Sequence, residues 1–308
     1  MALLHRFPLS SAPPGIVWRA LNTDDTAALE TLGRSCQATD GGFLLLPIAS
    51  YLADAAPAIG AFGTNGELLA YTAVRLTEAS GEALAAIIGQ VHPTARGRGI
   101  GRCLMDWSVA QGQALVAGTS ASQGALRIST EGLTPAAARL YARFGFVQQF
   151  AEDIMRHDLV VLPHAPLPAG IELLPWAAER AGAFFAAYTD SFRTRPGFSG
   201  WSAEQWISWA IDDDDFRPDW TLLAVHDGTP VGFILGGEGW VVQVGVVPEW
   251  RGRGLGAALV AEVLRRAQAG GAQAIMLDVN VNNPGAARVY TRLGFAATGQ
   301  RARYLRAL

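Results

Sequence analysis

The sequence predicts two mixed α/β domains in tandem, and three observations lead to this prediction. A glycine-rich phrase at residues 91–101 returns at residues 247–256, and a second phrase around Tyr141 returns around Tyr290. The first pair lies 155 residues apart and the second 149, about half of the 308-residue chain. Solenoid repeats span roughly 20–50 residues, so each copy is a whole domain. Within each copy, strands are expected to alternate with helices after an antiparallel start.

The first copy reads as short apolar runs bounded by turn residues, followed by apolar residues at helical spacing. Strands are expected at residues 17–19, 58–62, 68–76, 84–91 and 125–129, and helices at 24–36, 100–116 and 135–144. Small and polar residues at 118–124 indicate a loop, which accounts for the longer distance between the glycine phrases.

The second copy repeats this order of elements. Strands are expected at residues 171–174, 221–226, 231–236, 240–247, 275–279 and 303–305, and helices at 180–189, 203–211, 255–269 and 284–293. Asp227-Gly228 favours a tight hairpin turn between the second and third strands. The strand at 240–247 is apolar apart from Gln243, as expected for a strand covered on both faces.

A proline-rich stretch separates the copies. Pro163, Pro166 and Pro168 lie in a segment whose composition is typical of a semi-rigid linker. The expected organisation is an N-terminal domain at 1–160, a linker at 161–170 and a C-terminal domain at 171–308.

Composition narrows the function classes. The net charge of −3 gives no basic field that would favour nucleic acid or an anionic membrane. All 24 basic residues are arginine, so no lysine is available as a base or nucleophile. Cys36 and Cys103 form neither a disulfide framework nor a metal motif, and no apolar run reaches about 18 residues. These features predict a cytoplasmic monomer or homodimer without a metal, a nucleic-acid partner or a membrane association.

The glycine phrase carries the chemistry. A buried strand runs into Arg-Gly-Arg-Gly-x-Gly, and a helix begins inside that sequence. Backbone N–H groups of such a turn, together with the free donors of the first helical turn, form a concave anion site. Dinucleotide binding would need G-x-G-x-x-G in a first βαβ unit and an acid about 20 residues later. The phrase here lies in mid-domain after an antiparallel hairpin, which disfavours that alternative.

The two phrases together resemble the signatures of the GNAT superfamily, the GCN5-related N-acetyltransferases, over nearly the whole of both halves. The first is similar to its pyrophosphate-binding motif, and the second to its Ala-x-x-Tyr-x-Arg-x-Gly-Phe segment. The resemblance implies a twisted mixed sheet whose fourth and fifth strands splay apart around acyl-CoA. It also implies direct transfer of an acetyl group from acetyl-CoA to the primary amine of a small molecule.

The resemblance assigns the cosubstrate contacts by position. In the second half, strand-end backbone groups would bind the pantetheine arm and turn amides the pyrophosphate: Val244, Gly245, Val246, Arg251, Gly252, Arg253, Gly254, Leu255, Gly256, Ala257, and the helix-capping Asn283. The matching first-half residues are Gly89, Gln90, Val91, Arg96, Gly97, Arg98, Gly99, Ile100, Gly101 and Arg102.

Tyr290 and Tyr141 match the tyrosine that commonly protonates the departing CoA thiolate, as acyl transfer requires. Each could equally be a half-buried helix residue. Glu238 is the candidate general base, with an exposed turn acid as the alternative. Thr134 replaces Asn283 in the first copy and reaches less far. The second half is therefore expected to be catalytic, and the first to bind CoA weakly or to act as a scaffold.

The region between the first two strands of the second half is expected to bind the acceptor. Phe198, Trp201 and Trp206, with Trp209 nearby, could hold an amine by cation–π contacts. The acidic run 212–215 beside them is equally explained as a solvated loop. Two further interpretations stay open: a catalytically inactive acyl-CoA-binding sensor, and a layout similar to that of the mycothiol synthases.

Overall fold

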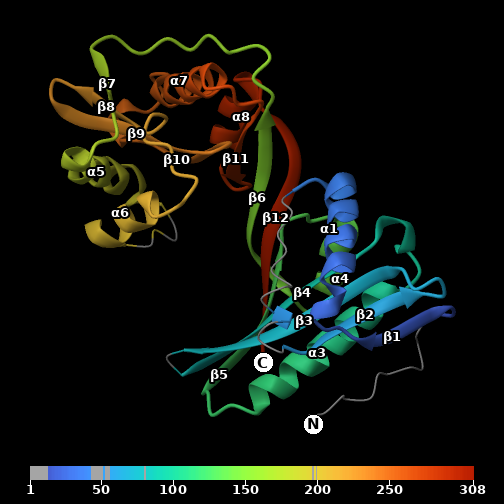
Figure 1. The fold of residues 1–308 in the computed structure, drawn as a ribbon. Coiled ribbons are helices and arrows are strands. Elements are labelled where there is room, and N and C mark those ends of the chain that lie inside the picture. The colour runs from blue at the N-terminus through green and yellow to red at the C-terminus, as the bar shows by residue number, and fades with distance from the viewer. Residues whose placement is uncertain (1–12, 43–50, 53–55, 80, 196–197, 199) are drawn as a thin grey trace. The chain divides into compact units, whose positions relative to one another are not determined.

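A computed structural model describes residues 13–42, 51–52, 56–79, 81–195, 198 and 200–308 (Figure 1). The chain folds into two compact units, Met1–Asp153 with Thr298–Leu308, and Ile154–Ala297. Each unit is a mixed sheet covered by helices, which confirms the predicted α/β class.

The first unit follows the predicted order of elements. Its elements are β1 (Ile16–Ala20), η2 (Thr23–Asp25), α1 (Thr26–Asp40), β2 (Ala58–Gly63), β3 (Leu68–Ala79), β4 (Glu82–Val91), η3 (Pro93–Ala95), α3 (Ile100–Ala117), β5 (Gln123–Thr130), α4 (Pro135–Arg143) and the start of β6 (Val147–His157). Strands β1 to β4 are antiparallel neighbours in chain order, and β5 runs parallel to β4.

Alternation along β3 places one helix on each face of this sheet. Tyr71 and Ala73 belong to the apolar cluster of α1. The Thr72 hydroxyl instead lies 2.7 Å from the Ser108 hydroxyl of α3. Gly112 of α3 lies so close to the sheet that a Cβ there would meet Leu126 at 2.7 Å. The glycine therefore permits the close packing of α3 on the strands that border the site.

The second unit repeats this plan. Its elements are the end of β6, β7 (Ile171–Pro175), η4 (Ala178–Arg180), α5 (Ala181–Phe192), α6 (Ala203–Ile211), β8 (Leu222–His226), β9 (Thr229–Gly237), β10 (Trp240–Val246), η5 (Pro248–Trp250), α7 (Leu255–Ala269), β11 (Ile275–Asn280), α8 (Pro284–Arg292) and the start of β12 (Ala296–Ala307). Asp227 and Gly228 both have positive φ, as the predicted hairpin turn requires.

Two apolar clusters cover the two faces of the second sheet. Leu222 and Ile234 pack with α7. Leu223 and Phe233, one position along each strand, pack with α5 and α6. This period of two is the burial pattern of a sheet with helices on both faces.

The last strand lies in the sheet of the first unit. Residues Ala302 to Ala307 of β12 pair antiparallel with Thr130 to Ala125 of β5. The sequence predicted a strand only over 303–305, and none over β6. Both strands are rich in polar residues, and these residues pair with one another: Arg301 with Glu152 at 2.6 Å, and Gln300 with Asp153 at 2.8 Å. Such reciprocal pairing is invisible to hydrophobic periodicity.

Candidate active site

In each unit, the fourth and fifth strands separate before β4 or β10 ends. The ladder between β4 and β5 stops at Ile87 and Ile128, so Ile88 to Val91 continue without a β5 partner. In the second unit, β10 pairs with β11 at Trp240 and Met276, near its beginning. A register shift between Val241 and Gln243 marks a bulge in β10. The gap leaves backbone groups of the strand ends available to a ligand.

The glycine turns follow these strand ends in the same conformation in both units. Gly97 and Gly99 have φ of 76° and 86°, and Gly252 and Gly254 have φ of 75° and 86°. Gly99 and Gly254 are the N-caps of α3 and α7, with no side-chain cap. Because first-turn amides have no partner inside their helix, both turns present donors suited to an anion.

The space around these turns is open. A Cβ at Gly97, Gly252 or Gly254 would meet no described atom within 4 Å. One predicted donor is already used, because the Arg102 amide donates to the Gly99 carbonyl at 3.0 Å. The free donors of the first turn therefore precede Arg102.

The leading arginine of each phrase points back into the protein. Arg96 Nε donates to the Val91 carbonyl at 3.0 Å, and Arg251 Nε donates to the Val246 carbonyl at 3.1 Å. Arg96 also pairs with Asp40 at the end of α1, and Arg251 donates to the Ser191 carbonyl of α5 at 2.8 Å. These side chains fasten the turn to the preceding helix. The second arginines, Arg98 and Arg253, are both exposed, and Arg253 lies 4.8 Å from the Trp250 ring centroid.

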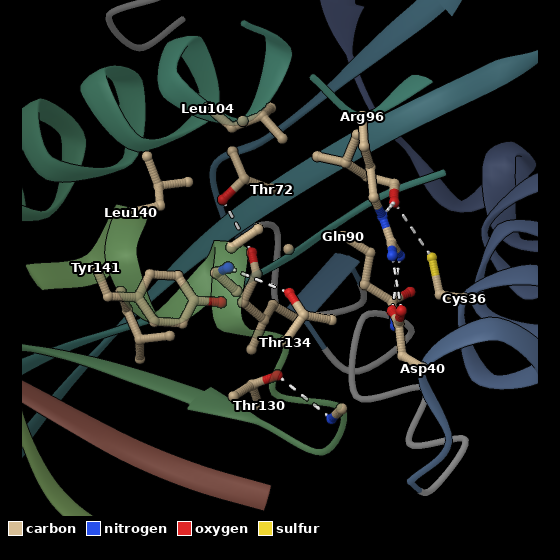
Figure 2. A pocket seen from close by; sticks show the side chains of 18 of the residues that line it. Cys36, Asp40, Thr72, Gln90, Arg96, Leu104, Thr130, Thr134, Leu140 and Tyr141 are labelled. Atoms are coloured by element: carbon tan, nitrogen blue, oxygen red, sulfur yellow. Dashed lines mark hydrogen bonds and ion pairs between the residues drawn. The ribbon is translucent and has the colours of Figure 1, made fainter. Parts of the chain in front are cut away.

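The first unit holds a cavity of about 310 Å³ between β4, β5, α1, α3 and α4 (Figure 2). Most of the predicted first-half contacts line it: Gly89, Gln90, Val91, Arg96, Gly97, Ile100 and Gly101. Tyr141 lies on one side of it, and the Arg96–Asp40 pair on the other. Cys36 also lines the cavity, with its Sγ 3.5 Å from the Val91 carbonyl, and burial raises the pKa of its thiol.

Both candidate acids are partly buried tyrosines. Burial raises the pKa of Tyr141 to about 12, and a hydrogen bond with the Thr130 side chain acts in the opposite direction. The Tyr141 ring meets Tyr304 of β12 edge-on, with centroids 5.1 Å apart. Burial also raises the pKa of Tyr290 to about 12, and its ring lies 6.0 Å from Phe295. Both phenols are therefore protonated at neutral pH and can act as donors.

Thr134 and Asn283, which distinguish the two halves in the sequence, have the same role in the structure. Thr134 Oγ1 accepts from the Ala137 amide at 3.1 Å, and Asn283 Oδ1 accepts from the Ala286 amide at 3.2 Å. Each caps the helix that carries its tyrosine. The replacement of Asn by Thr therefore gives no structural reason to rank one half above the other.

Glu238 lies in the turn between β9 and β10, at the end of β10 that is remote from the glycine turn. Its carboxylate accepts from Arg217 at 2.5 Å, and its side chain is 57% exposed. This geometry matches the alternative of an exposed turn acid.

A different carboxyl lies in the first-half cavity. Glu131 follows β5 directly and lines the cavity with Tyr141. Among the described residues its buried Oε2 has no hydrogen-bond partner, and burial raises its pKa. Glu131 was not among the predicted site residues, although an acid directly after the fifth strand was a usable signal.

The predicted acceptor aromatics separate into two environments. Trp206 is fully buried, stacks on Tyr188 at 4.9 Å and donates to Gln243 at the bulge of β10. Phe198 packs beside the same Tyr188 at 5.6 Å. Burial thus corrects the expectation that Trp206 presents a face to the acceptor, because its indole belongs to the core. Trp201 instead contacts Trp209, which is 44% exposed and borders the open acidic hollow of residues 212–215.

Comparison with known proteins agrees with this architecture. Residues 175–295 match the acetyltransferase (GNAT) family, and residues 60–148 match an acetyltransferase (GNAT) domain. The chain is a tandem GNAT acetyltransferase. GNAT acetyltransferases use acetyl-CoA as cosubstrate. The predicted family, the predicted acyltransferase class and the family's cosubstrate are therefore confirmed.

Relatives of this GNAT protein include named bacterial enzymes. A mycothiol acetyltransferase from Thermobispora bispora is 34% identical over 218 residues, covering 67% of this chain and 70% of that protein. One from Saccharopolyspora erythraea is 33% identical over 256 residues, covering 76% and 80%.

Solved structures share the tandem fold. A GCN5-related N-acetyltransferase from Sphaerobacter thermophilus superposes with a TM-score of 0.70 and 26% identity, covering 96% of both chains. A tandem GNAT protein from the clavulanic acid biosynthesis pathway has a TM-score of 0.56 at 18% identity, covering 95% of this chain and 98% of that chain. Within the described parts of this GNAT chain, no helix is long and apolar enough to cross a membrane, and no cluster of His, Cys, Asp or Glu could hold a metal ion.

Proposed function

We propose that this chain transfers the acetyl group of acetyl-CoA to the primary amine of a small molecule, with one cosubstrate site in each half. The observation that carries the proposal is the shared arrangement of a strand gap, an open glycine turn and a partly buried tyrosine with a raised pKa. The first-half cavity of about 310 Å³ supports accommodation of a pantetheine arm between the separated strands.

Acetyl-CoA fits the groups that each turn presents. The pyrophosphate would accept from the amides around Gly252 and Gly254, where a Cβ would meet no described atom within 4 Å. The helix N-terminus behind them adds the positive end of its dipole. The corresponding first-half groups surround Gly97 and Gly99. Arg96 and Arg251 act indirectly in this proposal, by holding the turn in place.

Tyr290 and Tyr141 are proposed as proton donors to the departing thiolate. A phenol with a pKa of about 12 keeps its proton at neutral pH, so it is available to protonate the thiolate as the C–S bond breaks. The acceptor nitrogen attacks the acetyl carbon, the C–S bond breaks, and the sulfur receives its proton from the phenol.

The acceptor is proposed to approach the second half near Trp201 and Trp209, the pair of aromatic rings that reaches the surface. The adjacent carboxylates of residues 212–215 favour a cationic amine. The names of the relatives from Thermobispora bispora and Saccharopolyspora erythraea support a narrower candidate, acetylation in the formation of mycothiol.

The deciding experiment measures free thiol released from acetyl-CoA by the purified full-length chain with a panel of small primary amines, including the amine precursor of mycothiol. Amine-dependent release with stoichiometric N-acetyl product supports the proposal. Tight acetyl-CoA binding without release for any amine would favour the acyl-CoA sensor.

A further inference from the structure

The Glu131 carboxyl is placed as an active-site group in the half that the sequence suggested to be a scaffold. It lines the cavity of the first unit together with Tyr141. Its Oε2 is shielded from solvent and has no hydrogen-bond partner among the described residues. A buried carboxyl oxygen left unsatisfied is costly, and a titratable group of this kind in a cleft is a candidate for a chemical role.

The backbone around Glu131 is fixed from two sides. A Cβ on Gly42, just after α1, would lie 1.8 Å from the Glu131 carbonyl oxygen, so the two chain segments touch here. On the other side, the Leu133 amide donates to the Gln300 carbonyl of β12 at 2.7 Å. The backbone that carries the carboxyl is therefore held between the segment that follows α1 and strand β12.

Glu131 and Tyr141 are linked through one residue. Thr130, the last residue of β5, forms a side-chain hydrogen bond with Tyr141. Glu131 follows it directly in the chain, and the Gly132 amide donates back to Thr130 Oγ1 at 3.4 Å. Glu131 and Tyr141 both line the cavity.

Burial and the surrounding charges together raise the pKa of Glu131. Burial makes the largest contribution and raises the pKa, and the nearby carboxylate of Glu152 acts in the same direction. Arg301 and Arg303 of β12 lower the pKa by smaller amounts. A carboxylate whose pKa is raised in this way is a better proton acceptor near neutral pH than an exposed one.

We propose that Glu131 is the general base of a second acetyl-transfer site, located in the first half, in which Tyr141 is the acid. This inference rests on the proposed function. A primary ammonium group gives one proton to the Glu131 carboxylate, which passes it to solvent. The free amine then forms the N–C bond to the acetyl group, and the C–S bond breaks. The second proton lost by nitrogen replaces the one that Tyr141 gives to the thiolate, so the products are the amide and free CoA thiol.

The test uses full-length protein carrying Tyr290→Phe, which suppresses the second half. Thiol release is measured with the amine of the panel that gives the highest rate in the unaltered protein. In this background, we expect Glu131→Gln to lower kcat by about 10²–10⁴-fold at pH 7, the range for loss of a general base. Calorimetric acetyl-CoA affinity should change less than about twofold, because the carboxyl takes no part in holding the pyrophosphate.

The pH profile separates a base from a structural residue. The loss of kcat caused by Glu131→Gln should become smaller as pH approaches the pKa of the amine, because the free amine then needs no base. Glu82→Gln, which removes an exposed carboxylate from the start of β4, is the matched control and should leave the profile unchanged. A deficit of equal size at every pH, or none, would overturn the role of Glu131.

Failure of the two proposals can be told apart. If the unaltered protein is active but Tyr290→Phe abolishes all thiol release, the first half has no transferase site and the inference is wrong. If the unaltered protein releases no thiol with any amine, the proposed function itself fails, and the second site fails with it. Loss of acetyl-CoA binding by both Glu131→Gln and Glu131→Asp would assign Glu131 a structural role instead.

Discussion

The Arg96 guanidinium donates two hydrogen bonds, each 2.6 Å long, to the two carboxylate oxygens of Asp40. The partners lie 56 positions apart in the chain, and Asp40 is the last residue of α1. This bidentate pair joins the end of α1 to the glycine turn that follows β4. In the second unit, Arg251 reaches the corresponding helix α5 by donating to a neutral carbonyl instead.

We expect Arg96→Lys to loosen the first unit by about 1–2 kcal/mol, because an ammonium group cannot form the paired bonds of a guanidinium. Hydrogen–deuterium exchange should become faster at the end of α1, and acetyl-CoA affinity should fall in the first half. Arg251→Lys is the matched control and should affect α5 by less. Unchanged exchange in α1 would show that the pair contributes little.

The glycine turn of the second half should tolerate no side chain when acetyl-CoA binds. Gly254→Ala introduces a Cβ at φ of 86°, which costs about 1–2 kcal/mol of strain, and places it beside the phosphate path. We expect calorimetry to show that the affinity of this half weakens by about 1–3 kcal/mol, the scale of lost hydrogen bonds.

Gly271→Ala provides the control for that strain. Gly271 has φ of 85°, and a Cβ there would also meet no described atom within 4 Å, but the residue follows the C-terminal end of α7. It should lower stability similarly and leave acetyl-CoA binding intact. Equal affinities for the two variants would place the pyrophosphate elsewhere.

Tyr290→Phe and Tyr141→Phe should each remove the turnover of one half, by about 10²–10⁴-fold for that half, because each phenol supplies a proton. The double variant should lack both contributions while it still binds acetyl-CoA. Tyr304→Phe, which removes only the hydroxyl that donates to Gln148 at 2.9 Å, is the matched control. Full activity of the double variant would exclude both tyrosines as acids.

The rate at limiting amine concentration should rise with pH as the free amine forms. Loss of the proton from an acid would instead lower the rate as pH rises. Because the pKa of Tyr141 and of Tyr290 is raised to about 12, both phenols keep their protons throughout the neutral and mildly alkaline range. We therefore expect no decrease in rate from loss of the acid until pH approaches that value. A decrease centred near pH 9 in the unaltered protein, absent from the Tyr→Phe variants, would contradict these environments.

The two tryptophan environments predict opposite phenotypes. Trp206→Ala should cost about 3–5 kcal/mol of stability, because it empties a fully buried site and removes a bond to Gln243. Trp201→Ala should instead raise the acceptor KM and leave the acetyl-CoA KM unchanged, as expected for lost uniform binding. A change in acetyl-CoA KM alone for Trp201→Ala would move the acceptor site elsewhere.

The local sequence pattern was sufficient to predict most of the strands, the helices and the glycine turn. The strand that ends at Val91 follows from a run of apolar residues, and the helix that begins at Ile100 from helical periodicity. The positive φ values at Gly97 and Gly99 follow from the conformational freedom of glycine. The positions of Tyr141 and Tyr290 followed from the second phrase in the same way. These features are encoded within about ten residues of where they occur.

The tertiary structure decided which side chains are buried and which distant residues they contact. It placed β12 beside β5 and Tyr304 against Tyr141, sent the Trp206 indole into the core, left Glu238 with Arg217 in an exposed turn, and enclosed Glu131 in the cavity. Desolvation depends on which distant elements cover a side chain, and it changes both the pKa of a carboxyl and its access to a substrate. Sequence alone therefore determined where the acyl-CoA motifs lie, whereas packing determined which carboxyl and which aromatic rings can take part in the chemistry.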